Sequence, residues 1–529
     1  MNSFKRKALT CAVLAGLGGI ATTAEAVYRN PDGTGMVLIY PYYTVNSIGG
    51  NAYNTYISVT NTSSVAKVTK VRFREGRTSA EVLDFNLYLS PNDVWVAALG
   101  PQGTDPNSPA VIFGNFETSC TYPVIPANGQ AFVNTAYTSG QDSLPGTGLD
   151  RTREGYVEIF DMATLIGAFA TNVTHTGIGV PPPNCSAMRV DLTTLATFAA
   201  NVTSPVGGLY GEGTIINVTA GAAVGYKADA LDAYRSTQYY ADVSTVNPQL
   251  GASAAPFSLV LANNRAVTDT WATGAGQASA GAKAFAAVFM HTSVMNDYIL
   301  DVGTKSNTDW VMTFPGKHEF YPTPTPVPPY SAVLVTTGAC EAVTFTFFDR
   351  DEQSTTPPPG GFSPQTAGPG PNNSSLCWES TVVSVRNGQA HTSAADVSST
   401  DPRSSVLGSK NVRAVSVLTS PAFSAGWLNI TFTGTNAIAP VGLTSLTGGS
   451  LDSASGVGPP PGFGPFASLS GTPGGPIAHN YLGLPVTGFM VNSRANASIA
   501  CTTPGGTAGT CAGNYATLFG HSYRTTIAP

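Results

Sequence analysis

Residues 67–96 read KVTKVRFREGRTSAEVLDFNLYLSPNDVWV, and this stretch decides the fold class. Apolar and polar side chains alternate along it in short runs, which are separated by polar breaks at 75–77 and 90–93. A similar run at 56–60 precedes it. A period of two residues is typical of β-strands, and short polar breaks are typical of the turns that join them. The region therefore predicts four strands that form the antiparallel ribbon of a β-sandwich.

One of these runs also indicates which side chains face the core. Val71 and Phe73 point one way, whereas Lys70, Arg72 and Arg74 point the other. We interpret this pattern as a strand with one solvent-exposed face. The lone tryptophan of the region, at 95, is expected in the core.

The same alternation recurs along the rest of the chain, so we predict a mainly β fold. The expected architecture is a set of antiparallel β-sandwich domains, immunoglobulin-like, with short helices and long loops rich in proline and glycine. Further strands are expected at 155–160, 213–218, 343–348 and 425–433, and short helices at 186–200 and 228–235.

The composition excludes several classes of protein. The chain has 529 residues, of which 11% are charged, and its net charge is −6. An ordinary soluble domain carries about a quarter charged residues. With 57 glycines and 39 prolines, long helical bundles and coiled coils are excluded, and a hydrophobic share of 42% is too high for a disordered chain. No basic stripe is present to bind nucleic acid, so no nucleic-acid partner is expected.

The N-terminus has the pattern of a secretory signal peptide. Lys5, Arg6 and Lys7 precede an apolar run at 8–20 and the small-residue site at 24–26. The apolar run is too short to cross a membrane, and no later window of 18 residues is both apolar and uncharged. We therefore expect cleavage after residue 26 and a secreted protein, extracellular or at the cell surface, with the periplasm as the alternative. No transmembrane segment is expected.

Composition shifts divide the mature chain into two regions. Residues 27–245 are expected to form an N-terminal β-sandwich region with short helical segments, and residues 246–529 a C-terminal β-rich region. The second region contains three tracts rich in proline and glycine, which are expected to be loops, at 322–329, 354–374 and 456–476.

Six cysteines remain once Cys11 leaves with the signal peptide, and an even number in an oxidising compartment indicates disulfides. They fall into three well-separated couples, although six cysteines allow 15 pairings. A metal site is disfavoured, because no Cys-x-x-Cys occurs and no histidine lies at ligand spacing. The predicted bonds are Cys120–Cys185, Cys340–Cys377 and Cys501–Cys511.

Several stretches carry a resemblance to a known family. They lie at 38–45 (LIYPYYTV), 71–76 (VRFREG), 87–91 (LYLSP), 295–298 (MNDY), 308–311 (TDWV) and 349–352 (DRDE). Over nearly all of the mature chain, the sequence resembles a family of secreted proteobacterial proteins that mostly carry hypothetical or cell-surface labels. The resemblance implies a surface location and no reaction, since the family has no established catalytic or binding residues.

The sequence contains one notable acidic group and no common catalytic signature. There is no Gly-x-Ser-x-Gly, no P-loop, no His-Glu-x-x-His and no Cys-x-x-Cys-His. Asp349, Asp351 and Glu352 follow a predicted strand and are a candidate calcium site, because calcium prefers carboxylate oxygens. With Arg350 between them, the alternative is a solvated or salt-bridged strand end. No cofactor is expected other than this possible calcium ion.

The sequence is compatible with three functions. The first is a non-catalytic, secreted structural protein of the cell surface or extracellular matrix, whose partners are itself, other matrix components or polysaccharide. The second is a carbohydrate- or calcium-binding module, adhesin-like, for which Tyr40, Tyr42 and Tyr43 could stack on sugars or could instead be strand core. The third is a secreted hydrolase without a recognisable motif, which would need two facing carboxylates.

Overall fold

The computed structural model describes most of the chain from Ala26 to Ala528. The described ranges are 26–48, 50–114, 117–143, 146–190, 199–242, 245–262, 265–274, 276–321, 325–334, 338–352, 354–355, 375–387, 397–398, 401–417, 421–432, 437–440, 480–502 and 508–528. The predicted signal peptide lies outside the described residues, except for Ala26. The tract 456–476 also lies outside them, as do most of 354–374 and the first residues of 322–329.

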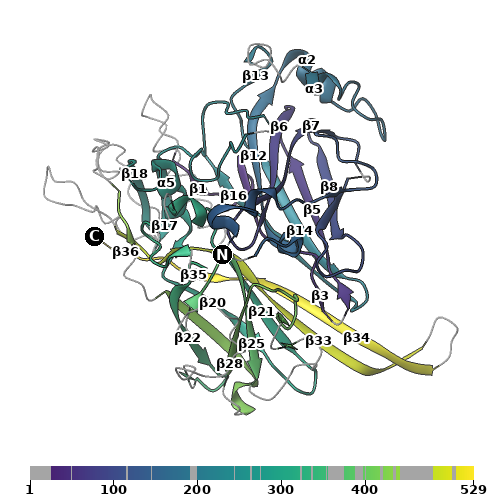
Figure 1. Ribbon diagram of the computed structural model, residues 1–529, viewed down its shortest axis with the longest axis vertical. Helices are drawn as coiled ribbons and strands as arrows, with labels where there is room; N and C mark the ends of the chain where they lie inside the picture. Colours follow the sequence, from purple (N-terminus) through teal and green to yellow (C-terminus); the bar gives the residue numbers. More distant parts are fainter. Residues whose placement is uncertain are drawn as a thin grey trace, which may run out of the picture.

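The predicted mainly β, antiparallel fold is confirmed (Figure 1). Among the named strands one pair is parallel, β25 with β28, and the other pairs are antiparallel. Four sheets carry the architecture, and each draws its strands from one side of residue 245 alone. They are called sheets 1 to 4 below.

Sheets 1 and 2 come from the N-terminal region. Sheet 1 has the strand order β1 (Tyr28–Arg29), β16 (Asp229–Asp232), β2 (Val37–Thr44), β12 (Glu154–Leu165), β6 (Lys67–Glu75), β7 (Glu81–Leu89) and β10 (Cys120–Tyr122), with β13 (Val202–Thr203) paired to β12. Sheet 2 has the order β11 (Gln130–Ala131), β9 (Ala110–Phe113), β8 (Val94–Pro101), β5 (Asn54–Asn61), β14 (Leu209–Asn217) and β15 (Ala222–Lys227).

Sheets 3 and 4 come from the C-terminal region. Sheet 3 has the order β23 (Ser354–Thr355), β22 (Glu341–Phe348), β29 (Ala425–Phe432), β20 (Ser293–Ile299) and β35 (Ser522–Arg524), with β24 (Ser375–Leu376) paired to β22. Sheet 4 has the order β28 (Val412–Val417), β25 (Ser380–Asn387), β21 (Asn307–Thr313), β33 (Thr487–Thr502) and β34 (Ala508–Gly520).

The remaining elements are short. The small sheets pair β3 (Ser47–Ile48) with β4 (Asn51–Ala52), β17 (Phe257–Ala262) with β18 (Arg265–Thr270), β19 (Met290–His291) with β32 (Leu484–Pro485), and β26 (Val397–Ser398) with β27 (Asp401–Pro402), and they join β30 (Ala437–Ile438), β31 (Asn480–Leu482) and β36 (Ile527–Ala528). The α-helices are α2 (Gly167–Val173), α3 (Ala187–Val190) and α5 (Ala280–Phe289), and the 3-10 turns are η1 (Thr135–Tyr137), η2 (Gly140–Ser143), η3 (Leu149–Arg153), η5 (Lys317–Phe320) and η6 (Pro421–Ser424).

The helix predicted at 228–235 is wrong. Residues 229–232 form strand β16, which pairs with β2 on one side and β1 on the other. Backbone hydrogen bonds to β2 stabilise this segment as a strand. They outweigh its local preference for a helix, because a short isolated helix is only marginally stable. Of the helix predicted at 186–200, α3 forms over 187–190, and 191–198 lie outside the described residues.

Two hydrophobic cores hold the layers together, and both contain residues from both regions. One core lies between sheets 1 and 2, where Val71, Phe73 and Trp95 pack with Val311 and Phe489 of sheet 4. The other joins sheets 3 and 4 to the opposite face of sheet 1 and to α5. Sheets 1 and 4 are therefore covered on both faces, and Trp95 is a core residue, as predicted.

The prediction that strand β6 has a solvent-exposed face is wrong. Lys70 and Arg72 are fully buried, and Arg74 is 6% exposed. Each is paired with a carboxylate from a neighbouring strand, at N–O distances of 2.5 Å for Lys70–Asp84, 2.7 Å for Arg72–Glu81 and 2.9 Å for Arg74–Glu158. The alternation does mark two different faces, but the second one is an internal charged layer, since segments that follow later in the chain cover it: Lys70 donates to Asp242 O and Arg72 to Pro248 O. Buried ions require such pairing.

The three tyrosines proposed for sugar stacking are core residues. Tyr40, Tyr42 and Tyr43 have no exposed surface, and their hydroxyls donate to Ser58 O, to a Glu154 carboxylate oxygen and to Thr152 O. A buried ring offers no face to a ligand, so this route to carbohydrate binding is excluded.

Glu154, the first residue of β12, joins the two regions. One of its oxygens accepts hydrogen bonds from the Tyr42 hydroxyl at 2.7 Å and the Ser409 hydroxyl at 2.6 Å, and the other accepts from the backbone N–H groups of Lys410 and Asn411 at 2.9 and 3.2 Å. The side chain is thus surrounded by donors, three of which belong to one C-terminal loop. Glu154 therefore fixes that loop against sheet 1.

Two disulfides are present, Cys120–Cys185 and Cys340–Cys377, and both are pairings that the sequence predicts. For the third pair, the backbone is described but the side chains are not. Cys501 lies opposite Gly509 and Cys511 opposite Ile499 in the β33–β34 ladder. The Cys501–Cys511 bond therefore stays a prediction.

We expect the double variant Cys120→Ser/Cys185→Ser to lower the free energy of unfolding by about 2–4 kcal/mol. The bond closes a loop across 65 residues, and its removal gives the unfolded chain more conformational freedom. Urea unfolding of the two proteins measures the difference. A loss below about 0.5 kcal/mol would show that the loop is held by its packing alone.

Protonation of His521 is expected to make the fold less stable at acidic pH. Burial lowers its pKa from 6.5 to about 4, although a hydrogen bond to Val311 O raises it slightly. Its Nε2 lies 3.0 Å from Val311 O and its Nδ1 lies 3.1 Å from the Asn296 amide nitrogen, so the neutral ring is satisfied on both sides. A second proton on Nδ1 would face the Asn296 donor.

Between pH 6.5 and 4 the unfolded chain therefore binds a proton at His521 that the folded chain does not, and stability falls as the pH falls. We expect wild type to lose about 3 kcal/mol more than His521→Gln between pH 7 and pH 4. Urea unfolding at several pH values measures both proteins. Equal losses would contradict this origin of the acid sensitivity.

Candidate functional site

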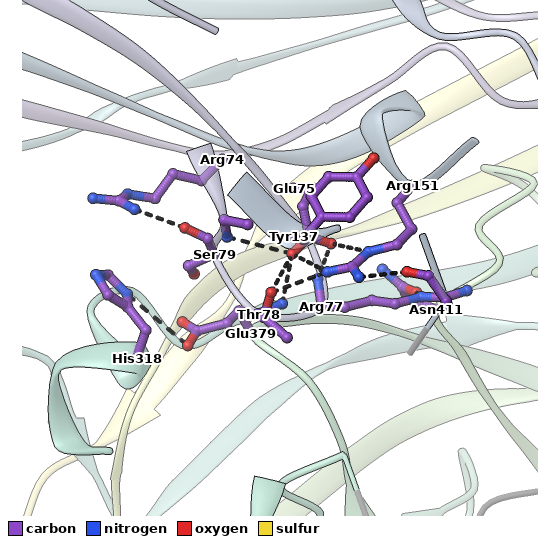
Figure 2. Close-up of polar contacts among 12 residues, drawn as sticks. Arg74, Glu75, Arg77, Thr78, Ser79, Tyr137, Arg151, His318, Glu379 and Asn411 are labelled. Carbon is purple, nitrogen blue, oxygen red and sulfur yellow. Dashed lines mark hydrogen bonds and ion pairs between the residues drawn. The ribbon is translucent and has the colours of Figure 1, made fainter. Parts of the chain in front are cut away.

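A cavity of about 530 Å³ lies at the junction of the two regions. Its N-terminal walls are the turn between β6 and β7 and the segment around η1 and η2, and its C-terminal walls are η5 and the stretches next to the Cys340–Cys377 disulfide. Figure 2 shows the polar side chains of this region. The lining residues used below are Arg74, Arg77, Ser79, Lys317, His318, Ala339, Trp378 and Glu379.

Glu75 organises the turn that forms the first wall. Its carboxylate accepts hydrogen bonds from the backbone N–H groups of Arg77 and Thr78 at 2.8 and 2.7 Å, and from the Thr78 hydroxyl at 2.8 Å. Arg151 donates to both oxygens, from Nε at 3.1 Å and from Nη2 at 2.7 Å. The turn is therefore closed around one buried acid rather than by a hydrophobic contact (Figure 2).

The charge state of Glu75 follows from these contacts. Burial alone would raise its pKa, but the charge of Arg151 and the hydrogen bonds from Arg151, Thr78 and Arg77 outweigh burial, and the pKa is held below its usual value. The Arg151 guanidinium also lies 4.0 Å from the centre of the Tyr137 ring. The acid is ionised and its counter-ion is fixed, so the pair is a structural support for the wall.

The opposite wall is joined to this turn through the backbone. The N–H of Glu379 donates to Gly76 O at 3.2 Å and to Arg77 O at 3.3 Å, and the N–H of Ser380 donates to Gly76 O at 2.8 Å. The Cys340–Cys377 disulfide immediately precedes Trp378 and immediately follows Ala339. The disulfide therefore holds the two C-terminal stretches of the wall together.

Three non-glycine residues of the lining have positive φ angles. They are Ser79 at 58°, Ala339 at 53° and Trp378 at 65°. This left-handed conformation is uncommon for residues with a side chain and costs free energy, so surrounding contacts must hold it. Strain of this kind concentrates at functional sites, which makes the cavity the best-marked candidate in the part of the chain that the structure describes.

The cations around the cavity already have partners. Arg74 pairs with Glu158 and donates to Ser79 O at 2.7 Å. The Lys317 ammonium donates to Ala339 O at 2.7 Å and to Trp378 O at 3.1 Å, and Arg77 donates to the Asn411 side chain at 2.9 Å. These charges support the walls.

His318 and Glu379 differ from these groups. Nδ1 of His318 and Oε1 of Glu379 are 4.0 Å apart, which is too long for a hydrogen bond (Figure 2). Both ring nitrogens of His318, and Oε2 of Glu379, have no hydrogen-bond partner among the described residues. The Glu379 side chain is 4% exposed and that of His318 22%.

Burial decides the protonation of this pair. Burial raises the pKa of Glu379 to about 8, although Lys317, Ser79 and Arg74 lower it. Burial, together with the charges of Arg74 and Arg72, lowers the pKa of His318 well below 6.5. Burial therefore favours the uncharged form of both side chains, a carboxylic acid beside a neutral imidazole. Each can both donate and accept a hydrogen bond.

The sequence predicts none of this site. Its residues come from segments that are separated by up to about 300 positions, and each looks like ordinary loop or strand when it is read alone. The one available signal was the density of charge at 67–75, which a strand with a solvent-exposed face also explains.

The acidic group proposed for calcium lies elsewhere, after β22. Asp349 is 4% exposed, and one of its oxygens accepts a hydrogen bond from the backbone N–H of Asp351 at 2.9 Å. Asp351 and Glu352 are exposed, and Glu352 has a φ of 66°. Within the described ranges, no group of three or more His, Cys, Asp or Glu side chains is arranged to hold a metal ion. Calcium binding stays a prediction.

A second feature of functional interest is the hairpin of β33 and β34, which runs beneath the N-terminal region and projects beyond the rest of the molecule (Figure 1). Strand β33 pairs with β21 only from Thr487 to Ser493, but it pairs with β34 as far as Thr502. We call residues 496–502 and 508–513 the distal ribbon. Its two outer edges have no partner strand among the described elements.

None of the helices that the structure describes is long and apolar enough to cross a membrane. Comparison of the chain with models of known protein families, with curated proteins and with solved structures gave no match.

Proposed function

We propose that the protein is a secreted, non-catalytic structural protein of the cell surface or extracellular matrix, and that it associates with further copies through the distal ribbon. The observation that carries the proposal is the ribbon itself, a two-stranded hairpin that continues well past the sheet to which it belongs. Such a hairpin is marginally stable in water when it is alone. A partner on its edges would supply the missing strand contacts.

The sequence of the ribbon supports this role. No charged residue occurs from Asn496 to Gly513, and Arg494 is the one charged residue from Thr487 to Gly520. Soluble proteins usually protect exposed strand edges with charged side chains, proline or bulges. The distal ribbon lacks the charges, and apart from one register shift between Asn496 and Ile499 its two strands are regularly paired, so its edges are suited to strand addition, in which backbone N–H and C=O groups pair with a neighbour. Low charge also leaves little repulsion between copies.

The disulfides support an oxidising location. Cys120–Cys185 and Cys340–Cys377 are the kind of bond that persists outside the cytosol. The candidate signal peptide also predicts export from the cytosol. Secretion, the surface location and the resemblance to proteobacterial surface proteins are parts of the proposal.

The test uses a variant that shortens the ribbon without altering the rest of sheet 4. Ala495 and Asn514 lie opposite each other in the ladder, so residues 496–513 can be replaced by Asn-Gly, a sequence suited to a two-residue hairpin turn. Sedimentation velocity of the mature protein over a range of concentrations is expected to show association for wild type. The shortened variant is expected to stay monomeric, because its edges no longer extend beyond the body.

The matched control is Cys501→Ser/Cys511→Ser, which keeps the ribbon at full length and removes the thiols that the shortened variant also lacks. It is expected to associate under reducing and oxidising conditions alike. A wild type that is monomeric at every concentration, or a shortened variant that associates as strongly as wild type, would contradict the proposal.

A further inference from the structure

Lys67 and Asp161 form a fully buried ion pair between the neighbouring strands β6 and β12 (Figure 1). Nζ of Lys67 lies 2.7 Å from Oδ2 of Asp161, and neither side chain has any exposed surface. Thr69 lies opposite Asp161 in the ladder, and Lys67 is two residues from Thr69 on the same face of the sheet. The register shifts between Asp161 and Ala163, and such bulges redirect side chains. The strand geometry therefore holds an amine against a carboxyl group.

This pair differs from the other ion pairs in its chemistry and its burial. An arginine guanidinium stays protonated in proteins, whereas a lysine amine is a nucleophile once it has lost a proton. Of the other lysine–carboxylate pairs among the described residues, Lys70–Asp84 has an acid that is 12% exposed, and Lys410–Asp150 is partly exposed at both side chains. Lys67–Asp161 is thus the pair at which an amine and an acid meet without solvent.

The buried surroundings favour the reactive forms of the two groups. Charges are costly in a dry interior, so transfer of a proton from the ammonium to the carboxylate costs less there than in water. Burial raises the pKa of Asp161, although the charge of Lys67 and several hydrogen bonds lower it. An amine beside a carboxylic acid is the pair of reactants from which an amide forms.

Two further groups adjoin the carboxyl group of Asp161. The backbone N–H of Gly207 donates to Oδ2 at 3.0 Å, where it stabilises negative charge that develops on this oxygen. Gly207 also lies against a second acid, since a Cβ atom at this position would be 3.1 Å from Oδ1 of Asp232. Burial raises the pKa of Asp232 and the charge of Lys67 lowers it, so this acid is close enough to interact with the amine.

From this geometry we propose that Lys67 and Asp161 are joined by an intramolecular amide bond, which forms within the folded chain. Nζ of Lys67 bonds to Cγ of Asp161, the bond from Cγ to Oδ1 breaks, and Oδ1 leaves as water with two of the three ammonium protons. Asp232 carries a proton from Nζ to Oδ1, and nothing is oxidised or reduced. Oδ2 remains as the amide carbonyl oxygen and keeps its hydrogen bond from Gly207. Oδ1 has no hydrogen-bond partner among the described residues, so its departure leaves no donor unpaired.

Such a bond would tie the first residue of β6 to an interior residue of β12, across 94 positions of the chain. Strand β12 lies in the middle of sheet 1, between β2 and β6. A cross-link between distant positions restricts the unfolded chain, as a disulfide does. Unlike the two disulfides, an amide is not cleaved by a reductant, so sheet 1 would stay cross-linked under reducing conditions too.

Mass spectrometry of the mature protein, after reduction of its disulfides and denaturation, tests the proposal. The protein is expected to be lighter than its sequence mass by one water molecule. Trypsin does not cleave after an acylated lysine, so the digest should contain a branched peptide that joins the segments of Lys67 and Asp161. The position has to be mapped by fragmentation, because an Asp-Gly sequence such as Asp32-Gly33 can also lose water, as a succinimide.

Three variants assign the parts of the reaction. Lys67→Arg keeps the positive charge and Asp161→Ala removes the carboxyl group, and both are expected to have their full sequence mass. Asp232→Asn cannot carry the proton, so most of it is expected to have its full mass. The matched control is Lys70→Arg, the same change in the neighbouring ion pair of β6, which is expected to lose water as wild type does.

Three outcomes would overturn the proposal, and the first two are read from wild type alone, whether or not the variants fold. They are a wild type of full sequence mass, a loss of water that maps to other residues, and a loss of water that persists in Lys67→Arg. A branched peptide as abundant in Asp232→Asn as in wild type would overturn the role of Asp232. None of these outcomes bears on the distal ribbon, whose test is the association of copies.

Discussion

Replacing Glu75 by glutamine is expected to lower the free energy of unfolding by about 3–5 kcal/mol. Arg151 would then lie buried without the carboxylate that it contacts with two nitrogens, and breaking a buried ion pair from one side has a cost of this size. The Arg151 side chain is 1% exposed and that of Glu75 is not exposed at all, so water cannot replace the lost partner. Urea unfolding at pH 7 measures the loss.

The double variant Glu75→Gln/Arg151→Met completes a thermodynamic cycle. If the loss arises from the uncompensated guanidinium, removing it as well should recover a large part of the stability. A double variant whose loss equals the sum of the two single losses would show that the two side chains act independently, contrary to the geometry of the turn.

Replacing Glu154 by alanine is expected to cost at least about 3 kcal/mol. Four buried or half-buried donors lose their acceptor at once, namely the Tyr42 and Ser409 hydroxyls and the N–H groups of Lys410 and Asn411. Each buried donor left unpaired costs about 1–3 kcal/mol, although the hydroxyls can rotate towards other acceptors. Because Ser409, Lys410 and Asn411 belong to the C-terminal region, hydrogen exchange at these three residues should also become faster.

Lys410→Met is the matched control for this variant. It removes the Lys410–Asp150 ion pair of the same loop, whose side chains are 15% and 23% exposed, but leaves the backbone N–H of residue 410 in place. Pairs with access to water contribute less than about 1 kcal/mol. A Glu154→Ala loss as small as that of Lys410→Met would contradict the role of Glu154 in fixing the loop.

The fold class was predictable because strand periodicity is local. The alternation at 67–96 reports the two faces of each strand, and the short polar breaks report the turns, without knowledge of the rest of the chain. Two of the disulfides were predictable for a similar reason, because the two cysteines of each couple lie closer to each other in the sequence than to the other cysteines. The third couple lies in the distal ribbon, where the side chains are not described.

What covers a strand was not predictable from the strand itself. Lys70, Arg72 and Arg74 alternate as a solvent-exposed face would, but segments far along the chain cover them. For example, Arg72 donates to Pro248 O and Lys70 to Asp242 O, contacts across more than 170 residues. The tyrosines at 40, 42 and 43 illustrate the same point. Their strand, β2, is buried by the layers packed on both faces of sheet 1, whereas its sequence would also fit a strand in an exposed sheet.

The candidate cavity could not be predicted from the sequence for a related reason. His318 lies in a short 3-10 turn, Glu379 comes just before β25, and Ser79 lies in a hairpin turn, and no motif spacing links them. Their meeting depends on how the two regions pack. The raised pKa of Glu379 likewise arises from burial, which no local sequence pattern reports.

Electron microscopy of the purified mature protein shows directly whether copies assemble through the distal ribbon. Negative-stain images of wild type should show assemblies in which copies meet at the projecting hairpin, and images of the variant with residues 496–513 replaced by Asn-Gly should show single particles. Single particles for both proteins, or the same assemblies for both, would contradict assembly through the distal ribbon.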